Sequence, residues 1–70
     1  MNFISSKLML VNELKSKGFD FSRSVFELSF SERTMLNEYA KEFGYKKPKT
    51  SYHSLGGCFY MHLQRLNKKL

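Results

Sequence analysis

The side chains best suited to bind a ligand lie close together between residues 46 and 54. Lysines there raise the local positive potential, and hydroxyl groups add hydrogen-bond donors. Gly56-Gly57 follows, where a glycine would let a sugar-phosphate backbone approach the N–H groups at the start of a helix. The stretch therefore predicts a phosphate anchor, and a basic loop that is merely solvated is the alternative. Its residues are Lys46, Lys47, Lys49, Thr50, Ser51, Tyr52 and Ser54.

The positive charge of the chain is concentrated in the same region. Residues 1–45 contain six basic and six acidic residues, whereas residues 46–70 contain six basic residues and no acidic one, which accounts for the whole net charge of +6. A one-sided basic segment indicates a polyanionic partner. We expect this partner to be a nucleic acid, DNA rather than RNA. An acidic protein surface is the alternative.

A second candidate contact surface is the polar face of the last expected helix. Tyr60, Gln64, Asn67 and Lys68 recur there at three- and four-residue spacing. Gln and Asn can read adenine and Lys can read guanine, so this face could enter a major groove. The alternative is the ordinary polar face of a helix that lies on the surface.

Cys58 and His62 are four residues apart, with His53 upstream, and this spacing superficially resembles that of metal ligands or of a nucleophile and its base. A structural zinc site needs four ligands, and the chain has a single cysteine and two histidines. No carboxylate lies near the pair in the sequence to orient the histidine. We therefore expect no metal, no cofactor and no enzymatic activity.

Three helices must position these residues, and we expect them at 4–17, 31–43 and 54–69. Apolar residues recur at three- and four-residue spacing in each range. Gly18 and Gly44 supply helix ends, and Ser29 and Glu32 have the spacing of a capping box. The expected class is an all-α single domain over residues 1–70.

Residues 26–30, Phe-Glu-Leu-Ser-Phe, alternate between apolar and polar. This period is typical of a half-buried strand, which would have to pair with its copy in a second chain. A helical turn or a loop is the alternative. We expect most aromatic rings of the chain to lie in the core, and only Tyr45 and Tyr52, which flank the lysines, are candidates to stack on bases.

Residues 25–66 resemble a ribbon-helix-helix repressor, with the alternating stretch, the Ser31-Glu32 helix start, an apolar stripe ending at Gly44, a connection and a second helix. The resemblance implies a dimer whose paired strands enter the major groove with Glu27 and Ser29 outward. It also implies that Ser51 or Ser54 anchors a phosphate. A helix-turn-helix domain that reads DNA with its last helix is the alternative architecture.

A chain of 70 residues has a small core, and its one cysteine excludes an internal disulfide, so we expect a homodimer. No apolar run approaches the length of a membrane span, and we expect a cytoplasmic protein of the phage- or plasmid-encoded type. The predicted function is that of a small DNA-binding regulatory protein. A non-enzymatic inhibitor or adaptor that docks its basic segment on an acidic protein is the alternative.

Overall fold

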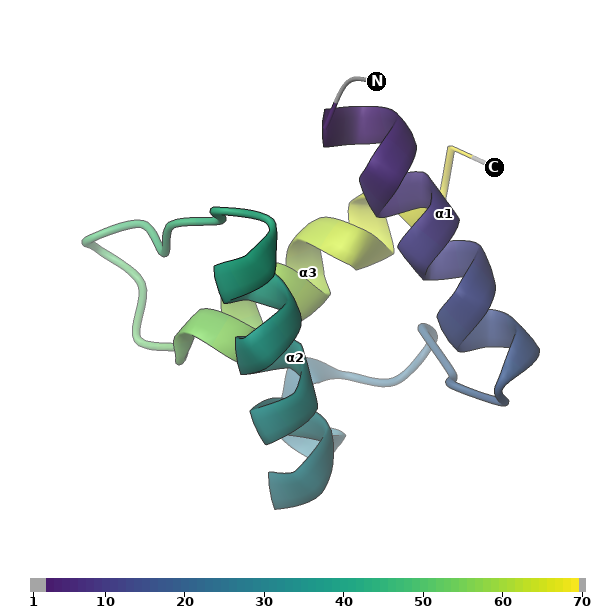
Figure 1. Ribbon diagram of the computed structural model, residues 1–70. Coiled ribbons are helices and arrows are strands. Elements are labelled where there is room, and N and C mark those ends of the chain that lie inside the picture. Colours follow the sequence, from purple (N-terminus) through teal and green to yellow (C-terminus); the bar gives the residue numbers. More distant parts are fainter. Residues whose placement is uncertain (1–2, 70) are drawn as a thin grey trace.

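The computed structural model describes residues 3–69 and contains three α-helices joined by long connections (Figure 1). They are α1 (Phe3–Ser16), α2 (Phe30–Glu42) and α3 (Leu55–Asn67), and a 3-10 turn, η1 (Val25–Glu27), precedes α2. The predicted all-α class is confirmed, and each observed helix agrees with its predicted range to within a few residues. None of the helices within residues 3–69 is long and apolar enough to cross a membrane.

The helix ends follow local rules that the sequence predicts. The hydroxyl of Ser29 accepts a hydrogen bond from the backbone N–H of Glu32 at 3.1 Å, and the Glu32 carboxylate accepts one from the N–H of Ser29 at 2.9 Å. This is the predicted capping box at the start of α2. Beyond the end of α2, Gly44 has a φ of +67°, and the N–H of Tyr45 donates to the carbonyl of Ala40 at 2.9 Å, as in a Schellman motif.

Within residues 3–69 the stretch 26–30 forms no strand, and the structure instead shows the alternative, a helical turn. Val25–Glu27 form one 3-10 turn, in which Ser24 and Glu27 make a second capping box. The Glu27 carboxylate accepts from the N–H of Ser24 at 3.0 Å. Glu27 and Ser29, the polar members of the alternation, are therefore cap residues of two consecutive helical segments. A ribbon formed by these residues in two chains has no basis in this geometry.

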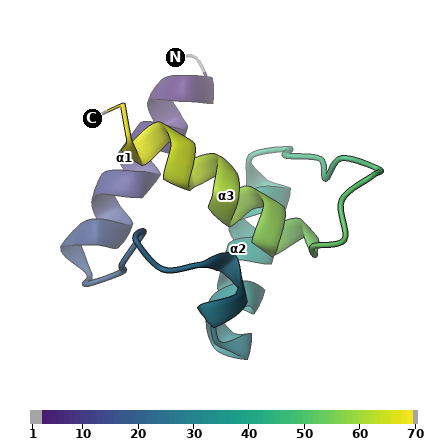
Figure 2. The same cartoon turned by 180° about the vertical axis from the view of Figure 1, so that it is seen from behind.

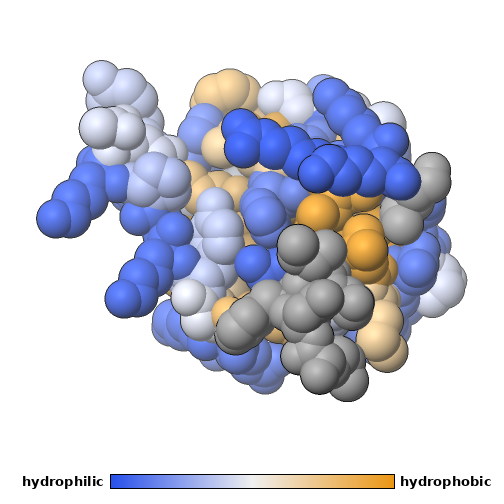
Figure 3. Space-filling view, turned by 90° about the horizontal axis from the view of Figure 1, so that it is seen from above, coloured by the Kyte–Doolittle hydropathy of each residue, from blue (hydrophilic) through white to orange (hydrophobic). Residues whose placement is uncertain are grey.

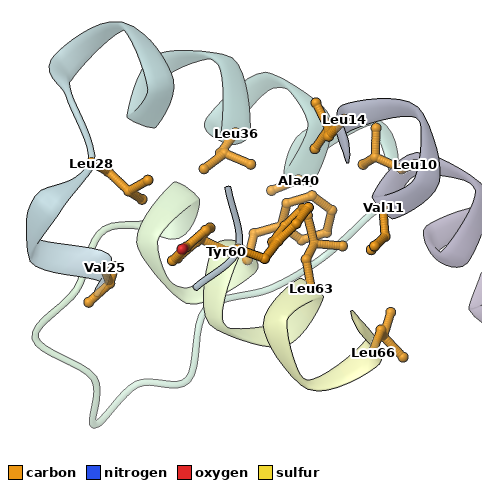
Figure 4. Packing of buried hydrophobic residues seen from close by; sticks show 12 residues of the cluster. Leu10, Val11, Leu14, Val25, Leu28, Leu36, Ala40, Tyr60, Leu63 and Leu66 are labelled. Atoms are coloured by element: carbon orange, nitrogen blue, oxygen red, sulfur yellow. The ribbon is translucent and has the colours of Figure 1, made fainter. Parts of the chain in front are cut away.

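The core surrounds α3, which packs against α1, α2 and η1. Phe59, Tyr60 and Leu63 of α3 are completely buried. Figure 4 shows how side chains from the other segments converge on this helix. These side chains are Leu10, Val11 and Leu14 of α1, Val25 and Leu28 around η1, and Leu36 and Ala40 of α2.

Candidate nucleic-acid interface

The connection between α2 and α3, residues 45–54, extends to one side of the helices (Figure 1). Lys46, Lys47 and Lys49 lie on it, and all three are exposed, as are Pro48 and Thr50. In Figure 3, hydrophilic side chains project on the same side of the molecule. We call residues 46–50 the basic loop. It presents three ammonium groups to solvent.

Both ends of the basic loop are fixed to α3. The Tyr45 ring packs against the ring of Phe59 at 5.3 Å between centroids, and its hydroxyl donates to the carbonyl of Cys58 at 3.4 Å. This burial raises the pKa of Tyr45. At the other end, the hydroxyl of Ser51 lies 3.0 Å from the sulfur of Cys58. The basic loop therefore connects two residues, Tyr45 and Ser51, that are each held against α3.

The helix start after the basic loop does not have the predicted form of a phosphate anchor. The Ser54 hydroxyl caps α3 by accepting from the N–H of Gly57 at 3.2 Å, and the N–H of Gly56 donates to the side-chain oxygen of Asn37 on α2. The hydroxyl of Ser51 accepts from the N–H of His53 in addition to its contact with Cys58. The N–H groups of Gly56 and Gly57 are therefore not available to a phosphate in this conformation, whereas the exposed Ser54 hydroxyl still has its own proton to donate.

The two glycines serve the packing of α3, not the approach of a ligand. A Cβ atom at Gly56 would lie 2.6 Å from the carbonyl oxygen of Arg33 on α2. A Cβ atom at Gly57 would lie 3.2 Å from Cβ of His53. Both residues are buried. The expectation that they admit a sugar-phosphate backbone is therefore wrong.

The predicted recognition face of the last helix is covered by the segment that precedes η1. Tyr60 is completely buried, and its hydroxyl donates to the carbonyl of Arg23 at 2.5 Å. The amide nitrogen of Gln64 donates to the carbonyls of Phe21 and Arg23 at 2.8 and 2.9 Å. Tyr60 and Gln64 therefore hold residues 20–23 in place. Of the predicted readers on this face, Lys68 is exposed.

A second basic cluster lies at the other end of α3 and borders the base of the loop. It consists of Arg65, Lys68 and Lys69, all exposed. The pKa of His62 is lowered, first by burial and then by the positive charges of Lys7, Arg65 and Lys69. The His62 ring lies 5.4 Å from the ring of Tyr45, which begins the connection. The second cluster therefore lies beside the ring pair of Tyr45 and His62.

Sequence reasoning missed the exposure of Phe26 and Phe30, whereas Tyr52 is among the predicted stacking candidates. The exposed fractions of Phe26, Phe30 and Tyr52 are 76%, 86% and 103%. The Phe26 ring lies 5.2 Å from the ring of His53. The spacing of two capping boxes could have revealed this exposure. Ser24 with Glu27 and Ser29 with Glu32 put Phe26 and Phe30 in the first turns of helical segments instead of on one strand face.

The remaining candidates do not assemble into a reactive centre. Among residues 3–69, no group of three or more His, Cys, Asp or Glu side chains could hold a metal ion. Cys58 is buried, with its sulfur against the hydroxyl of Ser51. Comparison of the chain with protein-family models, with curated proteins and with solved structures finds no match.

Proposed function

We propose that this chain binds nucleic acid, DNA in the first place, through the basic loop, and that it acts as a small regulatory protein without chemistry of its own. The observation that carries the proposal is the exposure of Lys46, Lys47 and Lys49 on a loop whose two ends are fixed to α3. Fixed ends lower the entropy that these lysines lose when they bind a partner.

The ion pairs of the described chain support this assignment. Lys17 pairs with Glu13 at 3.7 Å, Arg23 pairs with Glu32, and Lys41 pairs with Glu38 at 3.7 Å. All three pairs lie in the neutral part of the sequence. No lysine of the basic loop forms an ion pair with a described residue, so this charge is free to meet phosphates.

The proposed contact is electrostatic and gives a measurable salt dependence. Each phosphate neutralised on duplex DNA adds a slope of about −0.9 to the plot of log affinity against log salt. Three contacts give a slope of roughly −2.7, which corresponds to a loss of about 40-fold in affinity between roughly 50 and 200 mM salt. Such binding depends little on the sequence of the DNA.

The test is a salt titration of labelled random DNA, followed by fluorescence anisotropy. The loop variant replaces Lys46, Lys47 and Lys49 with alanine, and the matched control replaces Lys15, Lys17 and Lys41, so each has a net charge of 6 − 3 = +3. The loop variant should bind weakly, with the magnitude of its salt slope reduced by about 3. The control should keep most of its affinity and most of its salt slope. Equal losses of DNA affinity in the two variants would refute a binding site at the basic loop.

A protein partner is the second candidate, and one observation favours it. An apolar groove of about 550 Å³ lies between α1 and α2, with Met9, Leu10, Tyr39 and Phe43 in its lining. Grooves of this kind accept apolar side chains of other proteins. A protein-binding chain should show no detectable affinity for duplex or single strands at physiological salt, and the loop variant should not change that result.

A further inference from the structure

The exposed aromatic side chains and the basic loop together suggest a more specific ligand. We infer that the nucleic acid is single-stranded, with unpaired bases stacked on an aromatic strip formed by Phe26, Tyr52 and His53 while the lysines of the basic loop hold the phosphates. This inference rests on the proposed function, because it names the form of nucleic acid that the same loop would bind.

The strip is formed by two segments that are distant in sequence and converge at the start of α3. One is η1, which carries Phe26, and the other is the end of the connection that carries the basic loop. A Cβ atom at Gly57 would lie 3.2 Å from Cβ of His53 and 3.3 Å from a methyl group of Val25, so both segments meet over this glycine. Figure 2 shows η1 in front of α2 and beside the N-terminal end of α3.

The exposure of these rings is what points to a ligand. Four large hydrophobic side chains in the described chain are exposed, and three of them are Phe26, Phe30 and Tyr52. Their large exposed fractions leave the ring surfaces accessible to solvent. The Phe26 ring lies 5.2 Å from the ring of His53, which follows Tyr52 in the chain, and exposed apolar surface that is contiguous marks an interaction site more often than scattered exposed residues do.

The arrangement of rings and charges matches a single strand better than a duplex. Tyr52 and Lys49 are both exposed and lie three residues apart on the same connection, so a ring and an ammonium group are offered by one segment. Single-strand binders combine a positive surface that follows the backbone with rings that stack on successive bases. In a duplex the base faces are hidden within the stack, so the rings would have nothing to contact.

The composition of this surface argues for nucleic acid rather than protein. Protein interfaces are enriched in aromatic residues, but they are depleted in lysine. Here Lys46, Lys47 and Lys49 occupy the segment that leads directly into Tyr52 and His53. No acidic residue occurs anywhere in residues 46–70 to offset these charges.

The test compares a labelled oligothymidine of about 20 nucleotides with a random duplex of the same length. Tyr52→Ala and Phe26→Ala should each weaken binding to the single strand by about 5-fold or more and leave duplex affinity unchanged. Tyr52→Phe keeps the ring and should restore single-strand affinity. Asn12→Ala, which removes an exposed side chain of α1 far from the loop in sequence, is the control and should change neither.

The outcomes separate this inference from the function on which it rests. If the loop lysines matter for binding but Tyr52→Ala and Phe26→Ala leave single-strand affinity unchanged, the aromatic strip is not a base-stacking surface and the proposed function stands. If no nucleic acid binds, the proposed function itself fails. If the aromatic variants change only the mass measured by light scattering, the strip joins copies of the chain and the inference is overturned.

Discussion

Replacement of Gly56 by alanine should destabilise this protein, although the same change in most helices is stabilising. Alanine is favoured over glycine inside a helix by about 1 kcal/mol. At position 56, however, the new Cβ atom would lie 2.6 Å from the carbonyl oxygen of Arg33, 2.7 Å from the side-chain oxygen of Asn37 and 3.0 Å from the Asn37 nitrogen. Two of these atoms belong to the backbone of α2, so α3 would have to move away.

The size of the effect follows from two costs. Forcing an extra methyl group into a packed contact costs about 1–3 kcal/mol. Moving the first turn of α3 also breaks the bond between the N–H of Gly56 and Asn37, which adds about 1–3 kcal/mol if the buried groups stay unpaired. After the helix-propensity gain is subtracted, the expected loss is about 1–5 kcal/mol. For a domain of this size, that lowers the melting temperature by about 5–40 °C.

Gly57→Ala is the matched control, because it makes the same chemical change one residue further along the same helix. Its Cβ atom would lie 3.2 Å from Cβ of His53 and 3.3 Å from a methyl group of Val25. Side chains can shift by a few tenths of an ångström, so the expected change in unfolding free energy is within about 1 kcal/mol. Far-UV circular dichroism during thermal and urea unfolding measures both variants. A Gly56→Ala protein as stable as Gly57→Ala would refute the close approach of α3 to α2.

Two further predictions concern the segment that covers α3. Tyr60→Phe should lower the unfolding free energy in urea by about 0.5–1.5 kcal/mol, because the bond from its hydroxyl to the Arg23 carbonyl is lost while Gln64 still donates to that carbonyl, whereas Tyr52→Phe on the surface should have no effect. The Arg23 guanidinium lowers the pKa of Glu32 from 4.5 to about 2. Stability should therefore be full above pH 4.5 and decline as the pH falls toward 2, by an amount on the order of 1–2 kcal/mol. The substitution Glu32→Gln should flatten this decline in the free energy of unfolding. If the decline between pH 4.5 and 2 is the same in the variant, the ion pair of Arg23 and Glu32 does not cause it.

The three helices could be predicted because local signals specify them. The Ser29 and Glu32 capping box, the left-handed Gly44 and the Ser54 cap each act within a few residues, and all three are present in the structure. Apolar periodicity then identifies the buried faces of α1 and α2. Predictions of this kind succeed because the partner groups are close in sequence.

The stretch 26–30 could not be assigned by periodicity alone. Two capping boxes five residues apart, Ser24 with Glu27 and Ser29 with Glu32, place polar residues at every second position by coincidence of their spacing. A half-buried strand produces the same pattern. The first box, at Ser24, is the signal that distinguishes the two, and it lies outside the alternating stretch.

The burial of Tyr60 and the hydrogen bonds of Gln64 could not be predicted from local sequence patterns, for a different reason. Their partners, the carbonyls of Phe21 and Arg23, lie about forty residues earlier in the chain. A helix that is covered on several sides can carry polar residues that bond to a loop, and its sequence then resembles that of a surface helix. Only the tertiary arrangement shows that this face is inside.

The central position of α3 limits how the chain could recognise nucleic acid. A helix that supplies Phe59, Tyr60 and Leu63 to the core, with Tyr60 and Gln64 bound to the segment that covers it, cannot enter a major groove without unfolding that segment. Base edges in a duplex are read mainly from the grooves, whereas lysines contact phosphates and exposed rings stack on any base. A protein built in this way would discriminate between single and double strands more strongly than between sequences. Under the proposed function, the effect of the chain would then depend on where unpaired strands occur, not on an operator sequence.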